Sequence, residues 1–184
     1  MFVGGTAGPS RVLGIDPGVS RCGYGTVERK GLRLAAVSAG VITTSASDPL
    51  PARLVELAAQ LREVVAESDP EVVAVERVLF QANARTAMSV GQAAGLALVA
   101  AAEAGRQVVV YSANEVKQAV TGWGAADKAQ VQRMVAVLLE LEAPPRPADA
   151  ADALALAVCH LHLARGRARV EAALDQGRGG AGPR

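Results

Sequence analysis

Residues 11–18 read Arg-Val-Leu-Gly-Ile-Asp-Pro-Gly, an apolar run that ends in a turn. No polar side chain interrupts the run from Val12 to Ile15, which predicts a strand buried on both faces of a sheet. The proline and glycine that follow are turn residues, so the strand is expected to end at Asp16. This aspartate has an ordinary explanation, because aspartate before Pro-Gly is common in turns.

Apolar patterns along the rest of the chain predict four more strands and five helices. The strands are expected at residues 22–28, 32–42, 71–76 and 107–111. The helices are expected at residues 52–67, 83–104, 112–120, 126–141 and 148–164. A turn at Lys30-Gly31 makes the first strands antiparallel, whereas helical crossovers make the later strands parallel. The sequence therefore predicts an α/β fold with a mixed sheet flanked by helices.

The length of 184 residues suits one domain. We expect a flexible N-terminal extension at residues 1–10 and a folded domain at residues 11–165. Residues 166–184 are rich in arginine and glycine and have no apolar period, which predicts a disordered tail.

Composition limits the classes of protein that the chain can represent. Apolar residues make up 51% of it, enough for a sizeable core, and the net charge of +1 does not mark a nucleic-acid binder. An acidic site would, however, mask a basic surface elsewhere. Cys22 and Cys159 lack metal-binding spacing, as in proteins of a reducing compartment. The apolar window at residues 88–102 is too short to span a bilayer and no signal peptide is visible, so we expect a soluble, cytoplasmic protein.

Four carboxylates stand where active sites of α/β sheets form. Asp16 and Glu76 end buried strands, and Asp149 and Asp152 share one face at the start of the last helix. If they meet, their charges repel unless cations lie between them. Hard oxygen ligands suit magnesium, and two such ions can support phosphodiester hydrolysis. Each residue also has a simpler explanation, since Arg77 could pair with Glu76 and aspartate is favoured in the first turn of a helix.

Two lysines and two apolar residues are further candidates. Lys117 and Lys128 lie on the helices that flank a Gly-Trp-Gly loop, either as solvated charges or, beside the carboxylates, as phosphate contacts. Leu79 and Phe80 follow Glu76 in the sequence. They could belong to the core or stack on nucleobases. Both alternatives stay open for each pair.

Small residues mark one face of the helix at residues 83–104. Gly91 and Gly95 are four positions apart, a spacing that lets two helices approach closely. The partner helix could belong to the same chain or to a second copy, and the sequence does not decide between them.

Five blocks of the sequence, in order, resemble the RuvC family of Holliday-junction resolvases. The blocks are residues 14–18 with 23–25, 75–78, 82–95, 116–120 and 148–155. Together they extend from about Arg11 to Ala164, most of the chain. One such block would be weak evidence, whereas all of them in register are specific.

The resemblance implies an RNase H-like nuclease domain with a five-stranded mixed β-sheet flanked by α-helices. It implies a structure-selective endonuclease that resolves Holliday junctions by paired, symmetric phosphodiester hydrolysis in recombination and repair. Matching the family motifs residue by residue gives the catalytic and metal-binding set, which is Asp16, Glu76, Asp149 and Asp152. The implied cofactor is Mg²⁺, two ions per subunit, with Mn²⁺ as a substitute.

The resemblance also implies partners. They are four-way junction DNA, a second copy of the chain in a homodimer, and the RuvA-RuvB branch-migration complex. Lys117 and Lys128 match lysines implicated in junction binding. The family's base-stacking aromatic falls on Leu79, with Phe80 adjacent, so this chain departs from the pattern there.

Three alternatives remain at this stage. The Gly-x-Asp-x-Gly pattern after a strand also occurs in actin- and sugar-kinase-like ATP-binding proteins, although these need two lobes and a longer chain. Another RNase H-like nuclease would act on other DNA or RNA structures. An inactive junction-binding scaffold is disfavoured because all four acidic positions are filled.

Overall fold

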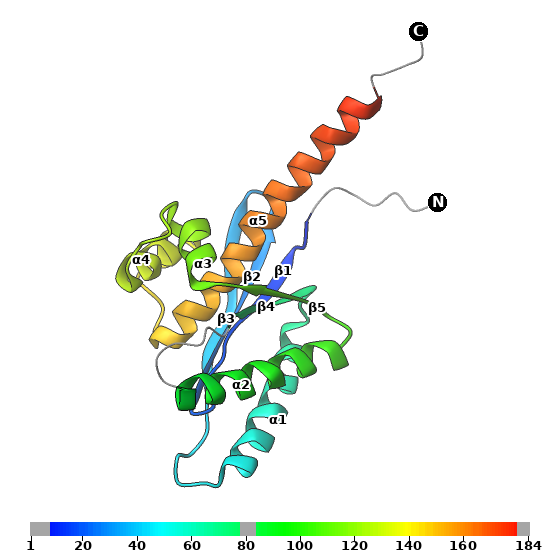
Figure 1. Cartoon of the computed structure of the whole chain (residues 1–184). Coiled ribbons are helices and arrows are strands. Elements are labelled where there is room, and N and C mark those ends of the chain that lie inside the picture. Colours follow the sequence, from blue (N-terminus) through cyan, green and yellow to red (C-terminus); the bar gives the residue numbers. More distant parts are fainter. Residues whose placement is uncertain (1–7, 78–83, 180–184) are drawn as a thin grey trace.

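The computed structural model describes residues 8–77 and 84–179. Its strands are β1 (Arg11–Asp16), β2 (Arg21–Lys30), β3 (Arg33–Thr43), β4 (Val72–Glu76) and β5 (Gln107–Tyr111). They form one sheet in the order β3-β2-β1-β4-β5 (Figure 1). β2 is antiparallel to both β1 and β3, whereas β4 is parallel to both β1 and β5. The predicted five-stranded mixed sheet is confirmed.

Helices cover both faces of this sheet. They are α1 (Leu50–Ser68), α2 (Ala84–Glu103), α3 (Ala113–Thr121), α4 (Lys128–Leu138) and α5 (Ala148–Gly179). α1 and α2 lie on one face, and α5 lies on the other with α3 and α4 packed against it (Figure 1). Successive side chains of β1 pack on opposite faces of the sheet. Val12 belongs to the hydrophobic cluster that includes residues of α5, and Leu13 belongs to the cluster that includes residues of α1 and α2. Burial on both faces explains why this strand is continuously apolar.

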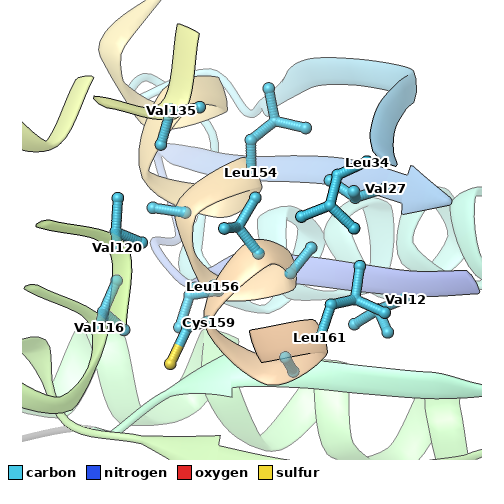
Figure 2. Packing of buried hydrophobic residues seen from close by; sticks show 14 of the residues in the cluster. Val12, Val27, Leu34, Val116, Val120, Val135, Leu154, Leu156, Cys159 and Leu161 are labelled. Atoms are coloured by element: carbon cyan, nitrogen blue, oxygen red, sulfur yellow. The ribbon is translucent and has the colours of Figure 1, made fainter. Parts of the chain in front are cut away.

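The helix α5 lies directly on the first two strands. Its Leu154 and Leu161 pack beside Val12 and Val27 of the sheet (Figure 2). A Cβ atom at Gly14 would overlap the carbonyl oxygen of Ala153 in this helix. The close approach therefore requires glycine in the centre of β1, and it brings the beginning of α5 to the end of that strand.

Local capping sets the ends of α3 and α4. The side chain of Ser112 accepts a hydrogen bond from the backbone N–H of Glu115, and Asp127 does the same for Gln130. In each pair the second side chain accepts a hydrogen bond from the backbone N–H of the first, a capping box. The box at Asp127 sets the start of α4 at Lys128, two positions after the predicted start at residue 126. The helix ends at Leu138, before the predicted end at residue 141.

The ends of the chain differ from the expectation in one respect. The backbone of residues 166–179 continues as part of α5, where the composition predicted a disordered tail. Residues 180–184 and residues 1–7 lie outside the described part, so the domain limits at residues 10 and 165 remain predictions. Within the described part of the chain, no helix has the length and hydrophobicity needed to cross a bilayer.

Candidate active site

An open cleft of about 360 Å³ lies where the sheet meets α3, α4 and α5. Three of the four predicted carboxylates line it, Asp16, Glu76 and Asp152. Both predicted DNA-binding lysines, Lys117 and Lys128, also line it. Residues from four regions of the sequence thus form one acidic cleft with two basic residues at its wall. The remaining lining residues are small or apolar: Ala113, Val116, Val131, Ala155 and Leu156.

Sheet register places Asp16 beside Glu76. The strands β1 and β4 are parallel and pair from Val12 with Val72 to Ile15 with Val75, so both carboxylates follow at the same end. Their side chains are hydrogen-bonded to each other. Two carboxyl groups can make such a bond only when one of them holds a proton. When one of the two residues is protonated, it can therefore donate a hydrogen bond to the other.

The electrostatics of Asp16 agree with this geometry. Burial is the largest cause that raises the pKa of Asp16, from 3.8 to about 7. The negative charges of Glu76, Asp152 and Asp149 raise this pKa further. Burial also raises the pKa of Glu76, which its hydrogen bond with Asp16 partly opposes. A cluster of this kind favours binding of protons or metal cations.

Asp152 reaches the cleft from α5 and is paired with a lysine. The Nζ atom of Lys128 lies 2.5 Å from its Oδ2 atom. This hydrogen bond is the largest cause that raises the pKa of Lys128, so the lysine stays charged. One ammonium group therefore neutralises part of the acidic cluster in the protein alone.

Asp149 lies just outside the cleft and is held by an arginine. The Nε and Nη2 atoms of Arg21, at the beginning of β2, donate to its Oδ2 atom at 3.0 and 2.7 Å. These hydrogen bonds are the largest cause that lowers the pKa of Asp149. Its charge is nevertheless close enough to raise the pKa of Asp16. The four predicted carboxylates therefore form one electrostatic cluster, with three of them lining the cleft.

The donor set of the cluster fits divalent cations in its chemistry. All four groups are carboxylates, the hard oxygen ligands that Mg²⁺ and Mn²⁺ take. Within residues 8–77 and 84–179, no three acidic, histidine or cysteine side chains are close enough to chelate one ion as they stand. Arg21 and Lys128 instead each hold one oxygen, Oδ2, of the carboxylates on α5. Chelation of one ion by three of these groups thus requires side-chain movement within the cluster.

Two predicted site residues lie outside the described part of the chain, and one residue of the site was not predicted. Leu79 and Phe80 lie outside the described residues, so their suggested role in base stacking remains a prediction. Arg21 was missed at the sequence level, because its partner lies 128 positions away. The only signal in the sequence is its place at the start of β2, next to the turn that follows Asp16.

Solved structures of other proteins share this fold. The structure of the yeast mitochondrial Holliday junction resolvase superposes with a TM-score of 0.63 at 15% identity, over 88% of this chain and 86% of that one. At this identity the likeness shows the fold alone. The fold class is RNase H-like.

More similar proteins define the family. A model of the family described as crossover junction endodeoxyribonuclease RuvC matches residues 12–160. The RuvC of Salinispora arenicola is 53% identical over 173 residues, covering 94% of this chain and 99% of its own. Thermus thermophilus RuvC, solved in complex with a Holliday junction substrate, superposes with a TM-score of 0.82 at 41% identity, over 86% of this chain and 97% of that chain. The chain belongs to the RuvC family of crossover junction endodeoxyribonucleases.

Proposed function

We propose that this protein resolves four-way DNA junctions by hydrolysing phosphodiester bonds at the acidic cleft. The observation that carries the proposal is the convergence of Asp16, Glu76 and Asp152 in one cleft with Lys117 and Lys128. Membership of the RuvC family and the relative solved with a Holliday junction substrate support the same activity. The role would be in homologous recombination and DNA repair.

The proposed cofactor is Mg²⁺, two ions per subunit, with Mn²⁺ as a substitute. Asp16, Glu76, Asp149 and Asp152 would hold the ions. When bound, such ions supply activation of the attacking water and stabilisation of the leaving oxygen. The raised pKa of Asp16, about 7, means that this residue must lose a proton before it can act as a ligand.

The two lysines of the cleft are suited to binding DNA phosphates. Lys117 on α3 and Lys128 on α4 line the same cleft as the carboxylates, so a phosphate that reaches the acidic residues also meets ammonium groups. Lys128 is paired with Asp152 in the protein alone, and a bound cation would release it. We infer that both lysines bind the DNA backbone near the cleaved bond.

The histidines take no part in this proposal. The Nδ1 atom of His160 lies 2.8 Å from the hydroxyl of buried Tyr111, and the Nδ1 atom of His162 lies 3.0 Å from the carbonyl oxygen of Ala119. Neither histidine lines the cleft. The acid-base chemistry of the site is therefore assigned to the carboxylates and not to imidazole.

Paired cleavage requires two sites, which we propose a homodimer provides. A Cβ atom built at Gly91 or Gly95 of α2 meets no atom within 4 Å among the described residues, so packing within that part of the chain does not explain these glycines. Met88, Leu98 and Val99 on the same helix are 67%, 39% and 47% exposed. An apolar helix with small residues suits self-association, and a two-fold dimer matches the symmetry of the junction.

Two further parts of the proposal follow from family membership. The RuvA-RuvB branch-migration complex would deliver the junction. The site of action would be the cytoplasm, which agrees with the two cysteines, Cys22 and Cys159, being free and buried.

A substrate comparison tests the activity. Purified protein is incubated with a four-way junction, a linear duplex and an RNA-DNA hybrid, each with Mg²⁺, Mn²⁺ or EDTA. We expect symmetric nicks in the junction alone and no cleavage in EDTA. Preferred cleavage of the hybrid would instead identify another RNase H-like nuclease. Nucleotide binding without cleavage would support the ATP-binding alternative.

A further inference from the structure

We propose that Arg21 is a positioning residue that fixes the carboxylate of Asp149 for divalent-ion binding. This inference rests on the proposed metal-dependent function. It adds a residue outside the four carboxylates and the two lysines, and it gives Arg21 a role that acts through Asp149 rather than through the DNA.

The geometry of the ion pair is specific. Both Nε and Nη2 of Arg21 donate to one oxygen of Asp149, Oδ2, at 3.0 and 2.7 Å. Arg21 therefore fixes the side chain through a single oxygen and does not engage Oδ1. A planar guanidinium that donates two hydrogen bonds restrains a carboxylate better than the single flexible ammonium of a lysine. The result is a carboxylate with a set orientation and one oxygen outside the grip of the arginine.

The backbone of Asp149 is fixed on the same strand. A Cβ atom at Gly23 of β2 would overlap the carbonyl oxygen of Asp149, so the first turn of α5 rests directly on this strand. Arg21 lies only two positions from Gly23. Main chain and side chain of Asp149 are thus both held by the beginning of β2.

The strand end that carries Arg21 is itself anchored. The hydroxyl of Ser20 accepts a hydrogen bond from Nη2 of Arg53 at 2.5 Å, and its carbonyl oxygen accepts one from the backbone N–H of Thr44. Nε of Arg53 also donates to the hydroxyl of Thr44. These contacts connect the β1–β2 turn to the end of β3 and to α1. A rigid support is what a residue that orients a metal ligand requires.

The two cations of the cluster differ in a way that separates their roles. Lys128 lines the cleft and makes one contact with Asp152, so it can leave that residue for a phosphate group. Arg21 does not line the cleft, and it belongs to a different element. Its side chain is 51% exposed, and an exposed ion pair adds little to stability. Orientation of Asp149, rather than stability or direct contact with the scissile phosphate, is therefore the role assigned to Arg21.

Measured ion affinity tests this assignment. Binding of Mn²⁺ to the full-length protein without DNA is followed by calorimetry for the wild type, Arg21→Gln and Arg21→Lys. Loss of a residue that orients a metal ligand weakens metal binding about 10–100-fold. We expect a decrease in this range for Arg21→Gln and a smaller one for Arg21→Lys, which restores the charge but not the paired donors. Lys30→Ala removes one positive charge from the far end of the same strand and should leave Mn²⁺ affinity unchanged.

A double-mutant cycle shows whether Arg21 acts through Asp149. In the Asp149→Asn background, the added change Arg21→Gln should have no further effect on Mn²⁺ affinity. Junction affinity in EDTA and the melting temperature in EDTA should match the wild type for Arg21→Lys and Arg21→Gln.

Each contrary result has a distinct meaning. Wild-type protein that binds no Mn²⁺ would refute the proposed function itself. If the wild type binds Mn²⁺ and Arg21→Gln binds it equally or more tightly, Arg21 is at most a competing counter-ion and the inference is wrong. Reduced junction affinity with unchanged Mn²⁺ affinity would make Arg21 a DNA contact, which also overturns it.

Discussion

The substitution Asp16→Asn should abolish cleavage and yet stabilise the metal-free protein above pH 7. Burial and the neighbouring carboxylates raise the pKa of Asp16 from 3.8 to about 7, so its ionised form is unfavourable in the fold. A neutral asparagine removes that charge and can keep a hydrogen bond with Glu76. Ionising a carboxyl group with this pKa difference between the unfolded and folded states destabilises the fold by on the order of 2–4 kcal/mol.

Because the pKa of Asp16 is higher in the folded state than in the unfolded state, the free energy of unfolding of the wild type falls as the pH rises. Below about pH 3 Asp16 is largely protonated in both the folded and the unfolded state, so wild type and variant should have similar free energies of unfolding. As the pH rises from about 4 to about 7, the unfolded chain releases the proton first and the wild type loses stability. Above pH 7 the advantage of Asp16→Asn is complete, an increase in melting temperature of roughly 4–15 °C.

Thermal unfolding in EDTA at several pH values measures this directly. Cleavage and junction binding of the same preparations are compared in Mg²⁺ and in EDTA, respectively. Loss of cleavage with retained junction binding and raised stability supports the metal-ligand role. If Asp16→Asn instead lowers the melting temperature at every pH and the folded protein still cleaves, Asp16 is a turn residue and the reasoning fails.

Four other outcomes are expected. Mn²⁺ affinity should rise with pH through about 7, because the proton on Asp16 must leave, and calorimetry showing no pH dependence would contradict this. Lys117→Ala and Lys128→Ala should each weaken junction binding and lower the slope of log affinity against log salt by about one; an unchanged slope would place the DNA elsewhere. Gly95→Trp should give folded monomers in sedimentation experiments, since the described residues leave open space at this position, and an intact dimer would place the interface elsewhere. Gly23→Ala should destabilise the fold by about 1–3 kcal/mol in denaturant unfolding, because its methyl group overlaps α5; unchanged stability would contradict that packing.

Much of the fold was readable because the cores of β1, β4 and β5 are continuous apolar runs. β5 was predicted with its observed bounds, Gln107–Tyr111, and β1 likewise, since polar or turn residues flank both. The boundaries of α4 were less accurate because its start depends on the capping box at Asp127. The pattern that marks this start, Asp127 followed three positions later by Gln130, is visible in the sequence.

The site was only partly predictable, for a physical reason. Strand register alone places Asp16 and Glu76 together, so their pairing follows from two parallel strands. The contribution of α5 depends on how closely the helix approaches the sheet, which glycines of β1 and β2 decide through packing. The direction of the Asp149 side chain depends in addition on Arg21, a contact that no local pattern reveals.

Anomalous diffraction from crystals of the protein grown or soaked with Mn²⁺ tests the central claim most directly. We expect two manganese peaks per subunit bonded to oxygens of the carboxylate cluster, with Asp16 among the ligands. Protein that cleaves four-way junctions in Mn²⁺ but shows no manganese bonded to Asp16, Glu76, Asp149 or Asp152 would contradict it.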